Sequence, residues 1–205
     1  MSCKIIKATK KGNLKLVVKL VSKYKNYNIQ YKCGIALIYA SCYNHKEIVS
    51  LLIDNNANLN VPDDNGSTAL IWALRENHKE IAIKLIDAGA NLDIQDILGD
   101  TVLMMASLYN SKKLVLKLLE NGADPNIRNI HGHTAFKVAS HNNHEEIMNY
   151  IKKWQETPKS LKFYSLKCIR SCNINTKNFP PLLLIPNPFI KEISPCESKK
   201  RKYTK

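Results

Sequence analysis

An all-α solenoid of about five helix-turn-helix units, followed by a short helical C-terminal appendage, is the fold that this sequence predicts. A segment that opens with Gly-x-Thr recurs every 33 residues, at Gly66, Gly99 and Gly132. Each copy carries apolar residues at helical spacing on both sides of a short polar turn. Because one such helix pair cannot bury its apolar face alone, neighbouring pairs must stack to form a continuous core.

The repeat register places the units at about residues 1–29, 30–62, 63–95, 96–128 and 129–155. The second unit keeps the register but has Ile35 where the later units have Thr68, Thr101 and Thr134. The first unit is one residue shorter between its landmarks. We therefore expect five units, of which the two outer ones are irregular.

The third unit shows how each helix pair is expected to form. Thr68 can cap the first helix with its side-chain oxygen, and apolar residues such as Leu70 and Ile71 follow at helical spacing. The turn Glu76-Asn77-His78 separates this helix from the second, "KEIAIKLIDAG", whose apolar residues lie on one face. Gly89 then stands where the helix C-terminus needs a left-handed backbone, as Gly122 does in the fourth unit and Asn56 in the second.

This pattern resembles the ankyrin repeat over residues 1–155. The period, the opening "GSTAL" and the closings "GANLD" and "GADPN" carry the resemblance. Ankyrin units usually have a His shortly after the Thr, where this chain has Ile38, Ile71, Met104 and Lys137. That departure removes a hydrogen-bond partner between units. The resemblance implies a protein-binding module with no catalytic activity and no cofactor.

In the ankyrin family, partners usually contact the hairpin tips between units and the exposed end of each first helix. In this register the third unit contributes Asp64, Asn65, Ser67, Arg75 and Glu76. The fourth contributes Ile97, Leu98, Asp100, Leu108 and Tyr109, and the fifth contributes Ile130, His131, His133, His141 and Asn142. Five of these side chains, at 97, 98, 108, 109 and 130, are apolar, which favours a hydrophobic centre for a protein partner. Alternatively, they pack locally on one another.

Catalytic and metal sites have little support in the sequence. His131, His133, His141 and His144 could be combined into a zinc site, but His144 matches His45 and His78 at the inter-helix turn, so it is a structural feature of the repeat. No phosphate-binding loop, nucleophile elbow or H-E-x-x-H motif occurs. We expect neither an enzyme nor a metal site.

The net charge of +14 is concentrated at the two ends. Residues 1–30 contain eight Lys and no acidic residue, and residues 156–205 contain 11 basic and three acidic residues. These ends lack the stacking aromatics interleaved with Arg that single-strand binders use, so nucleic acid is not the expected partner. No apolar run is long enough to span a bilayer, and the six cysteines show no paired spacing. We expect an intracellular, monomeric protein with reduced thiols.

Residues 156–194 resemble a suppressor-of-cytokine-signalling (SOCS) box. In that family a helix beginning S/P-L-x-x-x-C, with a later A-I-R, binds the elongin B/C pair, and an L-P-L-P element favours a cullin. Ser160, Leu161, Ile169 and Arg170 fall on this motif, and Tyr164 lies on the same apolar side of the predicted helix. Ile185-Pro186-Asn187-Pro188 stands in place of the L-P-L-P element.

The match has two departures. Ser165 replaces the buried Cys of the family, and Asn187 interrupts the proline element. A hydroxyl in an apolar socket weakens binding unless it finds a hydrogen bond. The segment can instead be a helix that caps the last ankyrin unit and covers Trp154.

The last residues, 195–205, are expected to form a basic disordered tail. Its run Lys199, Lys200, Arg201 and Lys202 is a candidate nuclear import signal. Short charged tails are also commonly only solvated. Cytoplasm and nucleus are therefore both expected locations.

Overall fold

The structure is a computed structural model that describes residues 2–23 and 28–156. The chain divides into two compact parts, and the first of them ends at Glu156. The SOCS-like segment at 156–194 lies outside the described residues apart from Glu156, and the basic tail at 195–205 lies entirely outside them.

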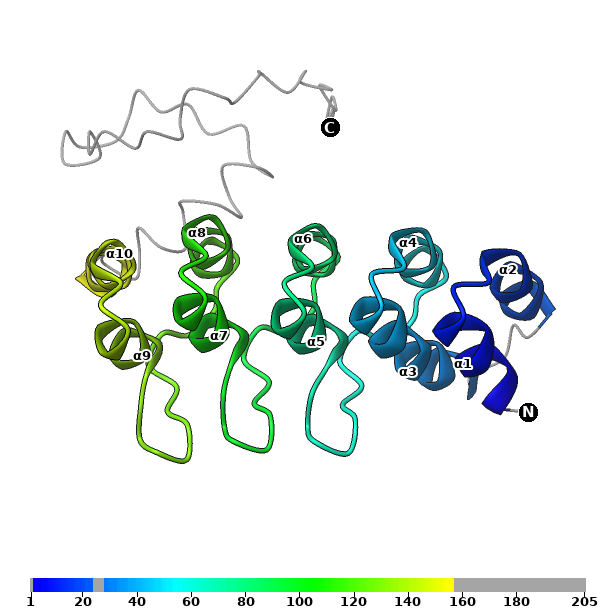
Figure 1. Cartoon of the computed structure of the whole chain (residues 1–205), viewed down its shortest axis with the longest axis horizontal. Helices are drawn as coiled ribbons and strands as arrows, with labels where there is room; N and C mark the ends of the chain where they lie inside the picture. The colour runs from blue at the N-terminus through cyan, green and yellow to red at the C-terminus, as the bar shows by residue number, and fades with distance from the viewer. Residues whose placement is uncertain (1, 24–27, 157–205) are drawn as a thin grey trace, which may run out of the picture. The chain divides into compact units, whose positions relative to one another are not determined.

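Ten α-helices and no strand occur in the described residues. They form five pairs in chain order, which confirms the predicted all-α solenoid of helix pairs. Figure 1 shows the second helix of every pair in one row and the first helices in a parallel row, with long loops projecting beyond the first helices. The helices are α1 (Ser2–Lys10), α2 (Leu14–Lys23), α3 (Asn28–Cys42), α4 (Lys46–Asp54), α5 (Ala69–Arg75), α6 (Lys79–Asp87), α7 (Val102–Leu108), α8 (Lys112–Glu120), α9 (Ala135–His141) and α10 (Glu145–Glu156).

Three threonines begin the first helices of the last three pairs, as predicted. Thr68 has an extended backbone, and its side-chain oxygen accepts a hydrogen bond from the Ile71 N–H at 3.4 Å. Thr101 and Thr134 cap α7 and α9 in the same way. Each threonine satisfies one backbone donor that the first helical turn leaves unpaired.

The second pair differs because it lacks this cap. Helix α3 begins at Asn28 and runs through Ile35, the position at which α5, α7 and α9 have their capping Thr. Ile offers no oxygen to stop the helix, so α3 extends to 15 residues where α5 has seven. The sequence shows the missing threonine at position 35, but the longer helix that results from it was not predicted.

Asparagine and glycine hold the turns within and after each pair. Asn44, Asn77, Asn110 and Asn143 join the two helices of the last four pairs with φ between 50° and 58°. After the second helices, Asn56 has φ 56°, and the glycines at 89 and 122 have φ 86° and 94°. The predicted left-handed positions are confirmed, and they suit residues that pay little for positive φ.

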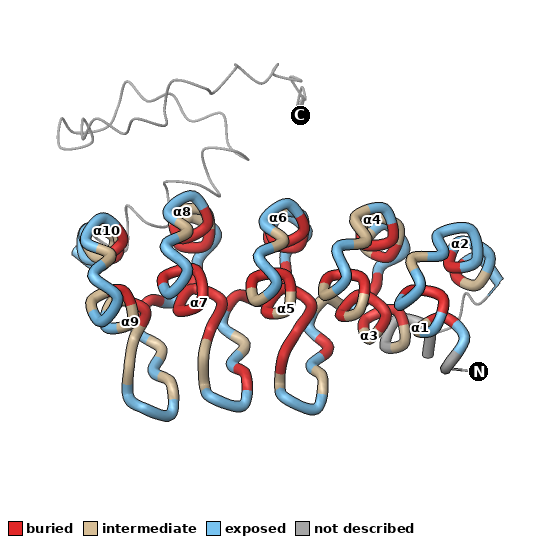
Figure 2. Tube along the Cα trace, viewed as in Figure 1, coloured by how far each residue is buried: buried red, intermediate tan, exposed pale blue. Residues whose placement is uncertain are grey.

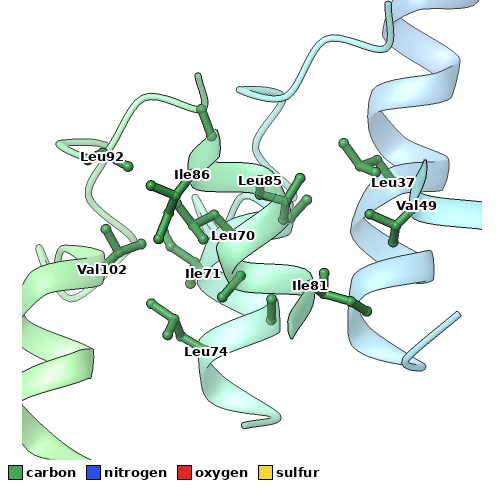
Figure 3. Close-up of a cluster of buried hydrophobic side chains, with 14 of the residues drawn as sticks. Leu37, Val49, Leu70, Ile71, Leu74, Ile81, Leu85, Ile86, Leu92 and Val102 are labelled. Carbon is green, nitrogen blue, oxygen red and sulfur yellow. The ribbon is translucent and has the colours of Figure 1, made fainter. Parts of the chain in front are cut away.

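The apolar core runs between the two rows of helices. Figure 3 shows Leu70 and Ile71 of α5 with Ile81, Leu85 and Ile86 of α6, flanked by side chains from the pairs on both sides. These five residues are at most 3% exposed. Burying a side chain of this size stabilises the fold by about 1.5–3 kcal/mol. In Figure 2 buried segments lie where the helices of a pair face each other and their neighbours, and further buried segments lie on the loops before α5 and α7.

The thiol of Cys33 belongs to this core and provides a probe of unfolding. It is 1% exposed, and burial raises the pKa of the Cys33 thiol from 9.0 to about 11. The raised pKa means that the neutral thiol contributes stability below about pH 9, and that this contribution is lost as pH rises toward 11. In a variant that keeps only Cys33, we expect a maleimide at pH 8 to react at least about 100-fold more slowly than with the urea-unfolded chain. Equal rates in the two states would contradict this packing.

No helix among the described residues is long and apolar enough to cross a membrane.

Candidate protein-binding surface

One turn geometry recurs in the loops that precede α5, α7 and α9. In the loop before α7, Oδ1 of Asp96 accepts hydrogen bonds from the backbone N–H groups of Leu98 at 2.9 Å and Asp100 at 2.8 Å. The backbone of Gly99 is left-handed there, with φ 75°. Asp63 and Asn129 make the equivalent bonds in the other two loops. Each tip is therefore a rigid hairpin rather than an open loop.

The tips are also bonded to one another. The Ile97 N–H donates to the carbonyl of Asn65 in the preceding loop at 2.9 Å, and the Ile130 N–H donates to the carbonyl of Leu98 at 3.1 Å. Figure 1 shows the three loops side by side, below α5, α7 and α9. Side chains on these tips are thus presented by a scaffold that is already ordered.

Two residues predicted to lie on the surface have a structural role. Ser67 is fully buried, and its hydroxyl oxygen accepts a hydrogen bond from Arg75 Nη1 at 2.8 Å. Arg75 Nη2 also donates to Oδ2 of buried Asp96 at 2.6 Å, which forms an ion pair between the third and fourth units. The prediction of Ser67 as a contact residue is wrong because its side chain is enclosed by this network. Arg75 is half-buried, and its guanidinium is occupied by the same bonds.

Asp100 is partly withdrawn in the same manner. Its Oδ1 accepts a hydrogen bond from Asn129 Nδ2 at 2.8 Å, which links the fourth unit to the fifth. Its side chain is half-buried. Asp100 therefore stabilises the contact between loops and presents only part of its surface.

The five apolar residues of the predicted surface lie in the open. Ile97 is 66% exposed, Leu98 47%, Leu108 44%, Tyr109 50% and Ile130 64%. Leu98 and Ile97 lie on the tip before α7, and Ile130 lies on the next tip. Leu108 is the last residue of α7, and Tyr109 follows it. The alternative drawn from the sequence was that these side chains pack locally on one another. Such packing does not bury them, because about half or more of each residue remains exposed. We call these five residues the apolar centre.

The comparisons with known proteins now decide the family of the repeats. A family model for three ankyrin repeats matches residues 5–96, and a second, for many ankyrin repeats, matches residues 85–139. Residues 5–139 are ankyrin repeats. No curated protein matches the chain. The ankyrin repeats indicate a protein–protein interaction module. The matches end at residue 139 and give no support to the SOCS-box resemblance.

Polar residues flank the apolar centre on both of its sides along the ankyrin array, in the third and the fifth units. In the third unit Asp64, Asn65 and Glu76 are exposed, and in the fifth unit His131, His141 and Asn142 are exposed. An apolar middle within a polar rim is the usual composition of a protein–protein interface.

The histidines of the fifth unit form an aromatic cluster. The ring of His133 lies edge-on to that of His141, with centroids 4.8 Å apart, and 6.0 Å from that of His131. No group of three or more potential metal ligands occurs in the described residues. The imidazole of His144 lies elsewhere, with Nδ1 donating to the carbonyl of Ser107 at 2.8 Å, and His78 makes the same bond to Ser41. These two histidines join successive ankyrin units.

One exposed aromatic residue of the array, Tyr43, was not among the residues predicted from the sequence. Tyr43 is 52% exposed and stands at the end of α3, in the same repeat position as Tyr109 at the end of α7. Residues 43, 76 and 109 are equivalent in the repeat register, so the register could have identified Tyr43 as an exposed residue. It was not selected because no hairpin tip was predicted beside it in the second unit. Tyr43 is therefore a matched control for substitutions of Tyr109.

Proposed function

We propose that the chain is a non-enzymatic adapter that binds a protein partner through the apolar centre of its ankyrin array. The observation that carries this proposal is the exposure of Ile97, Leu98, Leu108, Tyr109 and Ile130 on three neighbouring elements. A monomer gains nothing from leaving five large apolar side chains together in water. A partner that covers them removes that surface from solvent.

The bonded tips favour tight binding because little ordering remains to be done. The loop backbones are held by the Asp96 and Asn129 turns and by the bonds between loops. Binding to a rigid surface avoids the entropy cost of ordering a loop. Exposed apolar anchors at the middle of an interface contribute about 1–3 kcal/mol each.

The double substitution Leu98→Asp with Tyr109→Ala tests this proposal. It removes one aromatic anchor and puts a carboxylate among apolar groups, so we expect partner binding to weaken by about 100-fold, or about 3 kcal/mol. Both side chains are about half exposed, so the unfolding free energy should change by no more than about 0.5 kcal/mol. The measurement is quantitative affinity capture from an extract of cells that express the chain, with urea unfolding in parallel.

Tyr43→Ala is the matched control, because it makes the same tyrosine truncation at the equivalent position of the second unit. It should leave capture unchanged. Two results would count against the proposal: a double variant that captures the same proteins as the parent, or one that melts far below it, which would show that the two side chains support the fold.

A finer proposal concerns what the adapter recruits. Ser160, Leu161, Ile169 and Arg170 match the motif by which a SOCS box binds elongin, and they support recruitment of elongin B/C and a cullin to the bound protein. The competing proposal is a plain scaffold or competitive inhibitor with a structural C-terminal cap. The two differ in whether the purified chain retains elongin.

Leu161→Asp separates these proposals. If Leu161 enters an apolar elongin groove, an unpaired carboxylate there abolishes micromolar binding, while Ser165→Cys strengthens it. The variant should keep the partner of the apolar centre and the melting temperature of the repeats. Failure of the parent chain to retain purified elongin B/C at micromolar concentration would leave the plain scaffold.

A further inference from the structure

The N-terminal end of the array exposes side chains that every other unit buries. Leu16 and Leu20 lie one turn apart on α2. Leu16 is 41% exposed and Leu20 is half-buried. The equivalent residues of the four later pairs are at most 3% exposed; they are Ile48, Leu52, Ile81, Leu85, Leu114, Leu118, Ile147 and Ile151.

The cause is position in the stack. Each later second helix packs against the second helix of the pair before it, as α4 does on α2 and α6 on α4. No helix pair precedes α2 in the described residues. Leu16 and Leu20 therefore keep the apolar character of an internal unit in the first of the described pairs. We call these two residues, with Lys15 and Lys19 beside them, the end face.

The opposite end of the array is built differently. A terminal repeat needs a polar outer side to remain soluble. Lys152 and Asn149 of α10 are exposed, and the residues equivalent to Lys152 in α6 and α8 are the buried Ile86 and Leu119. The last described pair thus has the polar residues of a cap, whereas the first pair retains apolar ones.

Charge decides what can cover the end face. Residues 1–30 carry eight Lys and no acidic residue, and Lys15 and Lys19 are exposed on α2. Among the described residues, ion pairs join neighbouring second helices through Lys46–Glu80, Lys117–Asp87 and Lys112–Glu146, and none involves Lys15 or Lys19. The acidic counterpart of this lysine surface is therefore not supplied by the described part of the chain.

Like charge argues against occupants taken from this chain. A second copy joined end face to end face would bring two lysine-rich surfaces together. Residues 156–205 carry 11 basic and only three acidic residues, so that segment is equally unsuited. The polar end of α10, with exposed Lys152, offers no apolar complement to Leu16 either.

We propose that the end face is a second binding site, distinct from the apolar centre, for an acidic amphipathic helix of a partner protein. Inside the array the equivalent leucines and isoleucines are covered by a helix, so a helix with apolar residues three or four positions apart fits them. Glu or Asp along one side of that apolar stripe would face Lys15 and Lys19, which lie on the same side of Leu16 and Leu20. This charge pairing makes binding dependent on salt.

The test uses the full chain and a synthetic 18-residue helical peptide with Leu on one face and Glu on the remaining positions. Calorimetric titration at 50 mM salt should show binding that weakens at least tenfold at 500 mM salt. A peptide with Lys in place of Glu, and one with Ser in place of Leu, should each bind at least tenfold more weakly. Leu16→Ser, and separately Lys15→Glu with Lys19→Glu, should reduce the affinity for the Glu peptide by at least tenfold.

Lys113→Glu is the matched control, because residue 113 holds the same repeat position on α8 as Lys15 holds on α2. It changes charge as one Lys15 substitution does and should leave peptide affinity within twofold of the parent. The Leu98→Asp, Tyr109→Ala variant should also bind the peptide normally, which separates this site from the proposed function.

Three outcomes would overturn the proposal. The first is that the Glu peptide fails to bind, or binds the Leu16→Ser variant as well as it binds the parent. The second is that vesicles containing phosphatidylserine bind through Leu16 while the peptide does not, which would make the end face a membrane contact. The third is that sedimentation shows a dimer that Leu16→Ser dissociates, which would make the occupant a second copy of the chain.

Discussion

Asp96→Ala is expected to lower the unfolding free energy by about 3 kcal/mol, among the largest effects of any single substitution in the repeats. The carboxylate of Asp96 is nearly fully buried, closes the turn before α7 and pairs with Arg75. Alanine removes both turn bonds and leaves the half-buried guanidinium without its acidic partner. Urea unfolding followed by circular dichroism measures the change.

The contact between the fourth and fifth units indicates a double substitution that should restore the lost stability. Position 129 is equivalent to 96 and position 108 to 75, and there Asn129 closes the turn while Leu108 takes the place of the arginine. The double substitution Asp96→Asn with Arg75→Leu copies this native arrangement. We expect it to recover to within about 1 kcal/mol of the parent, since Asn keeps the turn acceptor and no charge is left unpaired. A loss as large as that of Asp96→Ala would show that the ion pair itself is required.

Gly99→Ala is expected to cost about 2–4 kcal/mol, because two penalties combine. The backbone of Gly99 has φ 75°, which costs an alanine about 1–2 kcal/mol. An added Cβ would also lie 2.9 Å from Cα of Asn129, in the backbone of the next loop, which cannot rotate away.

Gly132→Ala separates the two penalties. Gly132 has nearly the same backbone, with φ 72°, but a Cβ there meets nothing within 4 Å. It should cost only about 1–2 kcal/mol in the same urea experiment. If both alanine variants lose equal stability, the tight contact between the loops before α7 and α9 does not matter to the fold.

Local chemistry explains why much of the fold could be predicted from the sequence. A threonine cap and a left-handed glycine or asparagine act on residues within one turn of themselves, so Thr68 and Gly89 indicate their own structure. The same logic gave the apolar centre, since the register alone places Ile97 and Leu98 on a tip.

Contacts between units were harder to predict. Arg75 and Asp96 are 21 residues apart, and the register shows only that they lie in neighbouring units. Whether Arg75 turns inward depends on an acceptor in the next loop, which is why it differs from its exposed equivalents Leu108 and His141. The burial of Ser67 follows from this inward orientation of Arg75, which donates a hydrogen bond to the Ser67 hydroxyl. The exposure of Leu16 likewise depends on which neighbour is present, not on the residue itself.

Site-specific photo-crosslinking tests the central proposal most directly. Benzoylphenylalanine would be introduced at position 109, in the apolar centre, and separately at position 113, an exposed site on α8 in the other row of helices. We expect irradiation of cells that express these variants to give a protein adduct at 109 that disappears with Leu98→Asp, and no adduct of the same mass at 113. Absence of an adduct at 109, or equal adducts at both positions, would contradict binding through the apolar centre.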